Sequence, residues 1–396
     1  MGSPKNSAAK PAVAIVGGGV NGLAIAWRLA GAGCLVDVYD SGAIGPGTRG
    51  ATWAAGGMLA ASVEAEPGEE ALTALCLDSQ ARWPAFRDAL QAASGISVGY
   101  RDEGTLVVAT NRDEAAALRH HFDYQVGLGL KLEWLTPADA RQREPHLGRN
   151  LTAAVYSPGD HQVENRDLLR ALVVAAEKAG ARLHPNTAVE ALETVSGRTT
   201  GIVVAGQSVA ADAVVLAAGA WSGDLVGLPP EAKPPVRPVK GQMLALQMDP
   251  AAPILRHVVW APATYLIPRL DGRLLIGATV EERGFDETIT AGGLLALLDT
   301  AWRALPTIEE LPVVETWVGF RPTSRDDAPI FGPTSVEGLF LATGHHRNGI
   351  LLAPMTADAV SEAVLTGHLP AVAEPFRIDR FTATKYAARP KGKAVA

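Results

Sequence analysis

The stretch from Ala12 to Tyr39 constrains the fold of this chain more than any other part of its sequence. It opens with the continuous apolar run Ala12 to Val16, which is typical of a strand buried in a parallel sheet. A glycine-rich turn follows, and the apolar, alanine-rich run Leu23 to Ala30 then predicts a helix. After a second glycine-containing turn, the run Cys34 to Tyr39 predicts another strand. Strand, tight turn, helix and strand in this order predict a βαβ unit and therefore an α/β fold.

The first turn carries the pattern G-x-G-x-x-G at Gly17, Gly19 and Gly22, between the expected strand and the expected helix. Glycine allows the tight turn and lets the backbone approach a pyrophosphate, whose negative charge is stabilised at a helix N-terminus. Asn21 can add a neutral hydrogen-bond donor, and Asp40 ends the second strand where a carboxylate can bind ribose hydroxyls. We therefore predict a dinucleotide site, the alternative being a βα turn without a ligand. The pattern itself is common to NAD and FAD sites.

Composition and charge exclude several classes of protein. The 396 residues exceed the about 150 of a typical domain, and 47% of them are hydrophobic, which predicts two or three well-packed domains. A formal net charge of -7 argues against a nucleic acid or an anionic membrane surface as partner. The two cysteines, Cys34 and Cys76, cannot form a disulfide framework and predict reduced, buried thiols in a cytoplasmic protein. Residues 1–10 are expected to be a disordered leader, and glycines interrupt residues 12–27 too often for a membrane span.

Strand-like and helix-like segments interleave along the rest of the chain. An antiparallel sheet with a hairpin turn at Asp271-Gly272 is expected from five apolar runs, namely Glu103 to Thr110, Lys131 to Leu135, Gly241 to Met248, Thr264 to Leu270 and Leu274 to Val280. Between and after these runs the pattern alternates strand and helix again. We therefore predict a discontinuous Rossmann-type α/β domain formed by residues 11–61, 143–228 and 325–385, and an interleaved antiparallel-sheet domain formed by residues 62–142 and 229–324.

Three further segments resemble those of a known family. The glycine-rich stretch Gly42 to Met58 follows Asp40, DAVVLAAGAWSG begins at Asp212, and LFLATGHHRNGILL begins at Leu339. In order and spacing they resemble the flavin-contacting segments of the D-amino acid oxidase-type (DAO) family of FAD-dependent amine oxidases, most closely its glycine oxidase branch. The resemblance covers residues 12 to about 379 and implies that the α/β domain binds FAD and the antiparallel-sheet domain binds substrate. Sarcosine oxidase-like relatives attach flavin through a cysteine in the C-terminal region, where this chain has none, so non-covalent FAD is expected.

The resemblance also implies which residues hold FAD. Backbone N–H groups from His346 to Leu351 are expected to stabilise negative charge on the reduced flavin, and Pro354 is compatible with the helix N-terminus that this requires. Val189 matches a family residue that holds adenine through its backbone, and an ordinary buried valine is the alternative. The implied residues are, at the first turn, Gly17, Gly19, Val20, Asn21 and Gly22; at the adenosine, Asp40, Ser41 and Val189; near the flavin, Ala51, Thr52, Gly56, Gly57 and Met58; and in the later segments, Gly219, Trp221, Gly344, His346, Arg347, Asn348, Gly349, Ile350 and Leu351.

Three side chains are candidates for substrate binding and catalysis. Arg321, in GFRPTSRDDAPIFG, is similar to the family's G-x-R-P motif, and its planar guanidinium can clamp a carboxylate with two hydrogen bonds. Tyr265 matches the family's substrate-facing tyrosine, and strand alternation puts Ile267 and Arg269 on the same face. Arg347, in GHHRNG, corresponds to a family position beside the substrate amine. The alternatives are a solvated or ion-paired Arg321, a core aromatic at Tyr265, and an Arg347 that binds the flavin or another domain.

The histidine pairs predict neither a general base nor a metal site. Hydride can leave the α-carbon of a substrate with a neutral amine without an enzymatic base. The neighbours His345 and His346 cannot both face one site in an extended strand. His120 and His121 are expected to form a solvated pair on a helix, so no metal site is predicted.

The family resemblance implies an FAD-dependent oxidase for glycine or an N-substituted glycine. Hydride passes from the α-carbon to flavin N5, the imine hydrolyses to glyoxylate and an amine, and O2 is reduced to H2O2. Ala263 stands where some glycine-oxidising members carry a larger polar residue, and with Trp260 nearby the extra room favours sarcosine or a bulkier N-carboxymethyl amine. The alternatives are a sarcosine or D-amino acid oxidase, a carrier-linked dehydrogenase of the same fold, and a flavin-binding subunit without turnover. The sequence leaves open whether the chain forms a homo-oligomer and whether it serves thiamine supply or secondary metabolism.

Overall fold

The expected βαβ unit forms part of a six-stranded sheet in the structure, a computed structural model that describes residues 11–48 and 50–381. β1 (Ala12–Val16) and β2 (Leu35–Tyr39) are parallel, and α1 (Val20–Gly31) connects them. The order of the sheet is β18-β19-β12-β1-β2-β8, and β18 alone runs antiparallel to its neighbour among these described strands. The other strands are β8 (Arg182–His184), β12 (Ala213–Leu216), β18 (Ile330–Pro333) and β19 (Leu339–Thr343). This sheet and its helices confirm the predicted fold class.

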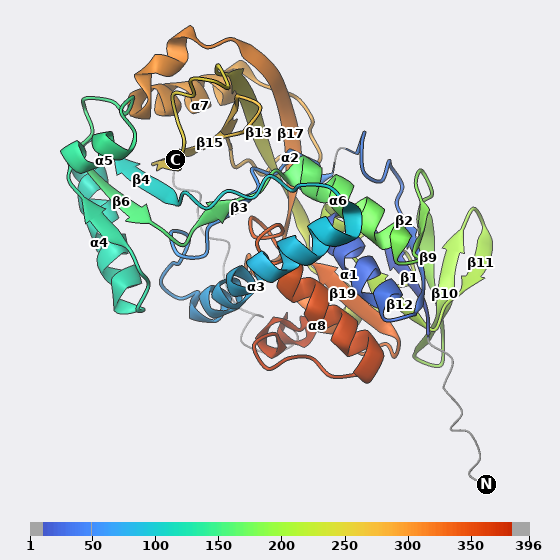
Figure 1. The fold of residues 1–396 in the computed structure, drawn as a ribbon. Helices are drawn as coiled ribbons and strands as arrows, with labels where there is room; N and C mark the ends of the chain where they lie inside the picture. Colours follow the sequence, from blue (N-terminus) through green and yellow to red (C-terminus); the bar gives the residue numbers. More distant parts are fainter. Residues whose placement is uncertain (1–10, 49, 382–396) are drawn as a thin grey trace.

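Two kinds of layer cover the six-stranded sheet. On one face α1 packs against α6 (Asn165–Lys178) and α8 (Ala353–Thr366), and α3 (Glu70–Ser94) packs against both of these helices (Figure 1). On the other face lies a three-stranded antiparallel sheet of β9 (Val189–Val195), β10 (Arg198–Val204) and β11 (Gln207–Ala210). Apolar side chains on both faces of the parallel strands are therefore buried, as their continuous apolar sequence predicts.

An eight-stranded sheet forms the second part of the molecule, in the order β17-β13-β16-β15-β14-β4-β6-β5. β15 and β16 form the expected hairpin, with Gly272 at a φ of +86° in the turn. β14, which is not among the strands expected from the sequence, pairs in parallel with β4, so the sheet is not antiparallel throughout as predicted. The strands are β4 (Thr105–Ala109), β5 (Glu133–Leu135), β6 (Ala153–Ser157), β13 (Arg237–Gln247), β14 (Val258–Ala261), β15 (Thr264–Pro268), β16 (Arg273–Gly277) and β17 (Val313–Thr323).

The position of β6 differs from the predicted domain boundaries. This strand lies within residues 143–228, which we assigned to the α/β domain, yet it pairs with β4 and β5 in the eight-stranded sheet. Its backbone finds its hydrogen-bond partners there, so the chain returns from the eight-stranded sheet to the six-stranded sheet only after residue 157. The rest of the domain division stays a prediction. The expected leader, residues 1–10, and residues 382–385 lie outside the described residues.

The eight-stranded sheet has two different faces. One packs against α5 (Pro137–Arg143) and α7 (Ala291–Ala304) in an aliphatic core. The other carries Met243, Ile267 and Trp317, which cluster with Trp53 and Ala54 of α2 (Ala51–Ala54). Because α2 lies in the loop expected to contact flavin, this second face determines where a site can form.

The remaining elements connect these layers. They are α4 (Arg112–Gly127), β3 (Met58–Leu59), β7 (His161–Gln162) and the 3-10 helices η1 (Gly219–Trp221), η2 (Pro230–Ala232), η3 (Pro306–Glu310), η4 (Glu374–Phe376) and η5 (Ile378–Phe381). In the part of the chain that the structure describes, no helix has both the length and the apolar character needed to cross a membrane.

Candidate active site

A cavity of about 890 Å³ is lined by residues of both large sheets. Every residue predicted to bind cofactor or substrate lines it, except Gly22 and Gly344. A Cβ atom at Gly22 would lie 2.0 Å from the carbonyl oxygen of Gly17, so this glycine lets α1 pack closely on the turn. Gly344 has a φ of +71° and turns the chain directly after β19. The predicted residues therefore come together in space, and those two shape the backbone around the cavity.

The turn between β1 and α1 has room for an anion. Gly17 has a φ of +113°, and a Cβ atom there would lie 2.3 Å from the carbonyl oxygen of Ala217. Gly19 precedes α1 without a side chain that could cap the helix, which leaves N–H groups of the first turn available to a ligand. The hydroxyl oxygen of Thr52 accepts the Val20 N–H at 3.0 Å. This contact ties the expected flavin loop to the expected pyrophosphate turn.

Asp40 organises the adenosine end of the cavity. Its Oδ2 accepts the N–H of Gly18 at 2.8 Å, and its Oδ1 accepts the N–H of Gly42 at 2.8 Å. A carboxylate has about four acceptor positions, so Asp40 can still accept hydrogen bonds from ribose hydroxyls. The sequence did not predict that the same carboxylate also holds two glycine-rich loops side by side.

The loop 51–58 lies against the face of β15 that carries Tyr265 and Ile267. A Cβ atom at Gly56 would lie 2.6 Å from Cδ1 of Ile267 and 3.3 Å from Cε2 of Tyr265. At Gly57, where φ is +71°, it would lie 2.1 Å from the carbonyl oxygen of Val163. Glycine is required at Gly57, where a side chain would collide with backbone, and at Gly56 it allows the close approach to the two side chains of β15. The strand face of Tyr265 therefore meets the expected flavin loop, as its predicted role requires.

Arg321 points a cation into the cavity from the end of β17. Its Nη1 donates to the carbonyl oxygen of Thr279 at 3.1 Å and approaches that of Lys240 at 3.4 Å. Among the described residues no carboxylate forms an ion pair with it. A Cβ atom at Gly241 would lie 2.8 Å from Nη1, so glycine at this position leaves space for the guanidinium. Arg321 is thus oriented by neutral acceptors and keeps its charge for a ligand.

Tyr265 lies beside Arg321 in the same cavity. Burial raises the pKa of its phenol, and the neighbouring Arg321 cation offsets part of this rise. The hydroxyl lies 4.0 Å from the sulfur of Met243, a weak acceptor, and the ring centroid lies 5.7 Å from that of Trp260. Tyr265 therefore keeps its proton at neutral pH and can donate it in a hydrogen bond to a ligand.

Arg347 lines the cavity, but carboxylates already surround its charge. Its Nε pairs with Glu64, and its Nη2 lies 3.3 Å from Oε2 of Glu69. Burial raises the pKa of the Glu64 carboxyl, and the Arg347 cation opposes this rise. These contacts correspond to the alternative in which Arg347 binds another part of the protein. Its predicted contact with the substrate amine stays a prediction.

His345 and His346 both line the cavity, which contradicts the argument from an extended strand. The argument was wrong because β19 ends at Thr343 and His346 has a φ of +47°. Nε2 of His345 lies 3.0 Å from Oγ1 of Thr356, and Nδ1 of His346 lies 2.8 Å from Oγ1 of Thr323. Burial lowers the pKa of each imidazole to about 3, so both rings are neutral at physiological pH.

Comparison with known proteins assigns the chain to a family. Residues 12–363 match the family described as DAO, FAD dependent oxidoreductase. The chain belongs to the DAO family. This DAO-family chain is 38% identical over 374 residues to a glycine oxidase of Geobacillus kaustophilus (strain HTA426), which covers 93% of this chain and 96% of the relative. It is 36% identical over 365 residues to a glycine oxidase of Pseudomonas putida, with 91% of this chain and 96% of that protein covered.

Solved structures show the same DAO-family likeness. The crystal structure of the Geobacillus kaustophilus glycine oxidase matches with a TM-score of 0.86 and covers 94% of this chain and 99% of that one. An iminodiacetate oxidase from Chelativorans sp. BNC1 matches with a TM-score of 0.81 at 27% identity, over 92% of this chain and 98% of that one. The family resemblance inferred from the four glycine-rich segments is therefore confirmed.

FAD is the cofactor of this DAO-family protein, and the residues around the cavity fit it. The cavity volume of about 890 Å³ is near the upper end of the ~300–1,000 Å³ usual for ligand pockets. The glycines at positions 17 and 57, where a side chain would collide with backbone, line this space together with the first turn of α1. Bound FAD supplies the acceptor for a hydride. Neither cysteine lines the cavity within the described residues, which supports the prediction of non-covalent FAD.

Several residues around the DAO-family site escaped the sequence analysis. Glu64 lines the cavity, but its partner Arg347 is 283 positions away, so no local pattern could connect them. Asn165 and Arg269 link the loop 51–58 to the end of β15 by hydrogen bonds. For Arg269 a signal existed, since strand alternation places it on the face of Tyr265. Within the described ranges, His, Cys, Asp and Glu side chains form no group that could hold a metal ion.

Proposed function

We propose that this DAO-family protein is an FAD-dependent oxidase that oxidatively deaminates glycine or an N-substituted glycine. The observation that carries the proposal is Arg321. Its guanidinium lies in the FAD cavity, is oriented by backbone carbonyls, and has Tyr265 beside it. A cation that pairs with no carboxylate of the described residues, together with an adjacent phenol donor, forms a binding site for a small carboxylate. The glycine oxidases that share 36–38% of their residues with this chain support the choice of glycine.

The side chains of the site bind and orient the substrate. Arg321 holds the carboxylate with two parallel hydrogen bonds, and the Tyr265 hydroxyl donates a further bond to it. His345 and His346 stay neutral, so they neither repel a cationic amine nor act as strong bases. A substrate with a neutral amine then loses a hydride from its α-carbon without a protein base. The imine takes up water and yields glyoxylate and an amine, and the two electrons reduce O2 to H2O2.

The rim of the cavity favours N-substituted glycines. Ala263 lies in the exposed turn between β14 and β15 and lines the cavity together with Trp260. A methyl side chain at Ala263 leaves space that a larger residue would fill. Glu64 and Glu69 neutralise Arg347, so a second carboxylate on the substrate would find no free cation at this residue. We therefore propose a preference for small neutral N-substituents, as in sarcosine.

Anaerobic reduction of the flavin tests this function directly. Purified holoenzyme is mixed without oxygen with glycine, sarcosine or D-alanine, and the visible flavin absorbance is followed. Glycine and sarcosine should bleach the flavin, and D-alanine should do so slowly, if at all. The Arg321→Ala holoenzyme is the control and should stay yellow. Failure of every N-alkyl glycine and of glycine to bleach the wild-type flavin would refute the proposal.

The electron acceptor and the location remain part of the proposal. We propose O2 as the acceptor, and a cytoplasmic location follows from the reduced thiols that the sequence predicts. An oxygen electrode and a peroxide assay test the first point. One H2O2 formed per substrate oxidised supports an oxidase, whereas turnover that needs an added dye supports a carrier-linked dehydrogenase.

A further inference from the structure

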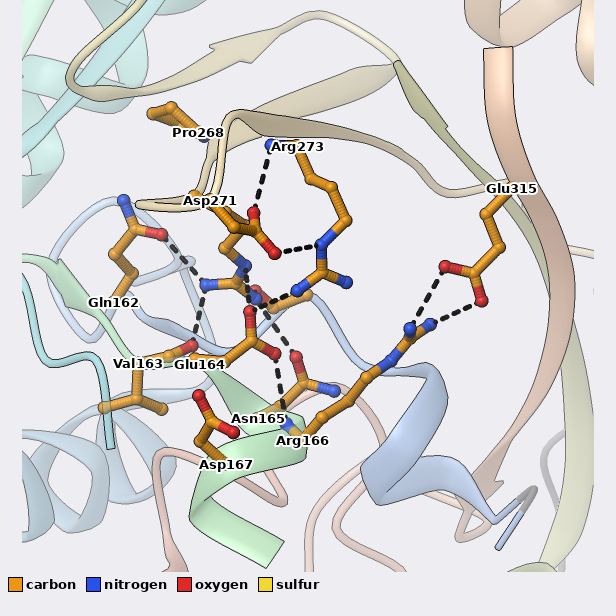
Figure 2. A network of polar contacts seen from close by, with 12 residues as sticks. Gln162, Val163, Glu164, Asn165, Arg166, Asp167, Pro268, Asp271, Arg273 and Glu315 are labelled. Carbon is orange, nitrogen blue, oxygen red and sulfur yellow. Dashed lines mark hydrogen bonds and ion pairs between the residues drawn. The ribbon is translucent and has the colours of Figure 1, made fainter. Parts of the chain in front are cut away.

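A buried arginine lies between the substrate strand and the segment that precedes α6. Only 5% of Arg269, which follows β15, is exposed. Its Nη1 donates to Oε1 of Gln162 at 3.0 Å and to the carbonyl oxygen of Val163 at 2.8 Å. Its Nε lies 3.2 Å from Oε2 of Glu164, at ion-pair distance. Figure 2 shows Gln162, Val163 and Glu164 converging on this point.

The other end of the same guanidinium reaches the loop 51–58. Nη2 of Arg269 donates to the carbonyl oxygen of Gly56 at 2.8 Å and to Oδ1 of Asn165 at 3.0 Å. Nδ2 of Asn165 in turn donates to the carbonyl oxygens of Thr52 at 2.8 Å and Trp53 at 2.9 Å. Arg269 therefore holds the loop at Gly56 directly, and at Thr52 and Trp53 through Asn165.

This network connects the two halves of the reaction site. One end of the hairpin strand β15 carries Tyr265, and Arg269 follows its other end. The loop 51–58 lines the FAD cavity, and the hydroxyl of Thr52 also accepts the Val20 N–H at the pyrophosphate turn. Because Arg269 directly follows β15 and donates to the carbonyl oxygen of Gly56, its side chain joins the loop to the end of this strand by a hydrogen bond of fixed direction.

A contribution to fold stability alone does not explain a buried arginine at position 269. Burying a charge is costly, and well-packed apolar side chains stabilise a core as well as a buried ion pair does. Burial lowers the pKa of Arg269 to about 10, which reflects this cost. An apolar side chain could not bind four acceptors in fixed directions, whereas a planar guanidinium can.

We propose that Arg269 is a positioning residue that sets the placement of the flavin loop 51–58 against the substrate strand β15. It acts through Gly56 and Asn165 and touches neither substrate nor cofactor. The inference rests on FAD as cofactor and not on the identity of the substrate. Its test therefore uses FAD binding and the flavin spectrum, which a failure of the proposed glycine activity would not affect.

The test compares Arg269→Lys with Arg273→Lys in holoenzyme. Arg273 is the matched control because it also binds Glu164, at 3.0 Å, and otherwise pairs with Asp271 at 2.7 Å, with no described contact to the loop 51–58 (Figure 2). Lysine keeps the charge but loses the fork, so acceptors on Gly56 or Asn165 lose their donor. We expect FAD to dissociate about tenfold more readily from R269K, with a shifted flavin absorption spectrum, and R273K to remain within about twofold of wild type. Dissociation is followed by the recovery of flavin fluorescence on dilution.

Asn165→Asp gives a second route to the same question. Aspartate keeps an acceptor for Arg269 and loses both donors to the carbonyls of Thr52 and Trp53. We expect N165D to weaken FAD retention and shift the spectrum in the same direction as R269K. If R269K does not fold, FAD retention and the flavin spectrum of N165D test the inference instead. Wild-type FAD retention and an unchanged spectrum in the folded variants would overturn the inference, even if their thermal stability fell.

Discussion

At the scale of single residues, Arg321 and Arg347 have the same side chain but different roles, because different groups surround them. Arg321 contacts backbone carbonyl oxygens, which orient a cation without neutralising it. Arg347 faces the carboxylates of Glu64 and Glu69, which do neutralise it. A substrate carboxylate gains more from Arg321, which has no ion pair within the part of the chain that the structure describes, because binding at Arg347 requires breaking an existing ion pair. We therefore assign the carboxylate to Arg321.

Arg321→Lys is expected to lower kcat/KM for glycine about a hundredfold, because an ammonium cannot form the two parallel bonds of a guanidinium. The visible spectrum and the retention of FAD should stay as in the wild type, since Arg321 does not hold the flavin loop. Steady-state oxygen consumption measures the first quantity and absorbance the second. The assignment would be wrong if R321K kept wild-type kcat/KM while Arg347→Lys lost it.

At the scale of elements, closely packed strands and loops make the site. β13 and β17 pair over most of their length, and Gly241 on β13 lies where a side chain would touch the Arg321 guanidinium. Likewise, a Cβ atom at Gly319 on β17 would lie 2.5 Å from Cβ of Ala54 in α2. These glycines allow the sheet, the loop 51–58 and the Arg321 side chain to share a small space.

Gly241→Ala is expected to raise KM for glycine about tenfold while the midpoint of thermal unfolding changes little. The added Cβ would lie 2.8 Å from Nη1 of Arg321, and a flexible guanidinium can move away without disturbing the sheet. Gly57→Ala serves as the comparison variant. Its Cβ would lie 2.1 Å from the backbone oxygen of Val163, which cannot move away as a side chain can. The Gly57→Ala substitution should lower both the midpoint of thermal unfolding and the retention of FAD. Equal loss of stability in both variants would contradict this distinction.

At the scale of the whole molecule, two neutral histidines, the buried His345 and the half-buried His346, connect elements that are far apart in sequence. His345 contacts Thr356 on α8 and lies 3.4 Å from Asn21 on α1, and His346 contacts Thr323 at the end of β17. Both pKa values are lowered from 6.5 to about 3. Between about pH 6.5 and pH 3 the two imidazoles are therefore protonated in the unfolded chain but not in the folded chain. The free energy of unfolding falls as the pH drops through this window.

The midpoint of thermal unfolding of the FAD-saturated enzyme should fall by about 5 °C between about pH 7 and pH 5. His346→Gln removes one of the two titrating groups and should lose about half as much over the same interval. Differential scanning calorimetry of both proteins at the two pH values measures the difference. If the midpoint fell equally in wild type and H346Q, carboxylates and not these imidazoles would cause the loss of stability at acidic pH.

The sequence by itself determined the local features of this protein. The apolar run before Gly17, the turn pattern and Asp40 led to the parallel βαβ unit, because strand burial, glycine turns and helix formation depend on neighbouring residues. The same holds for the hairpin at Asp271-Gly272. Family resemblance, carried by such local segments, indicated the residues that line the FAD cavity and the cofactor itself.

Only the tertiary structure decided the relations between distant segments. It moved β6 into the eight-stranded sheet, paired Arg347 with Glu64, and brought His345 and His346 to one cavity. Charge pairing, backbone hydrogen bonding between strands and the burial that lowers a pKa depend on groups far apart in sequence. The contacts of Arg321 with neutral carbonyl oxygens and of Arg347 with carboxylates follow from the same physics, since each depends on which acceptors the fold places around a guanidinium.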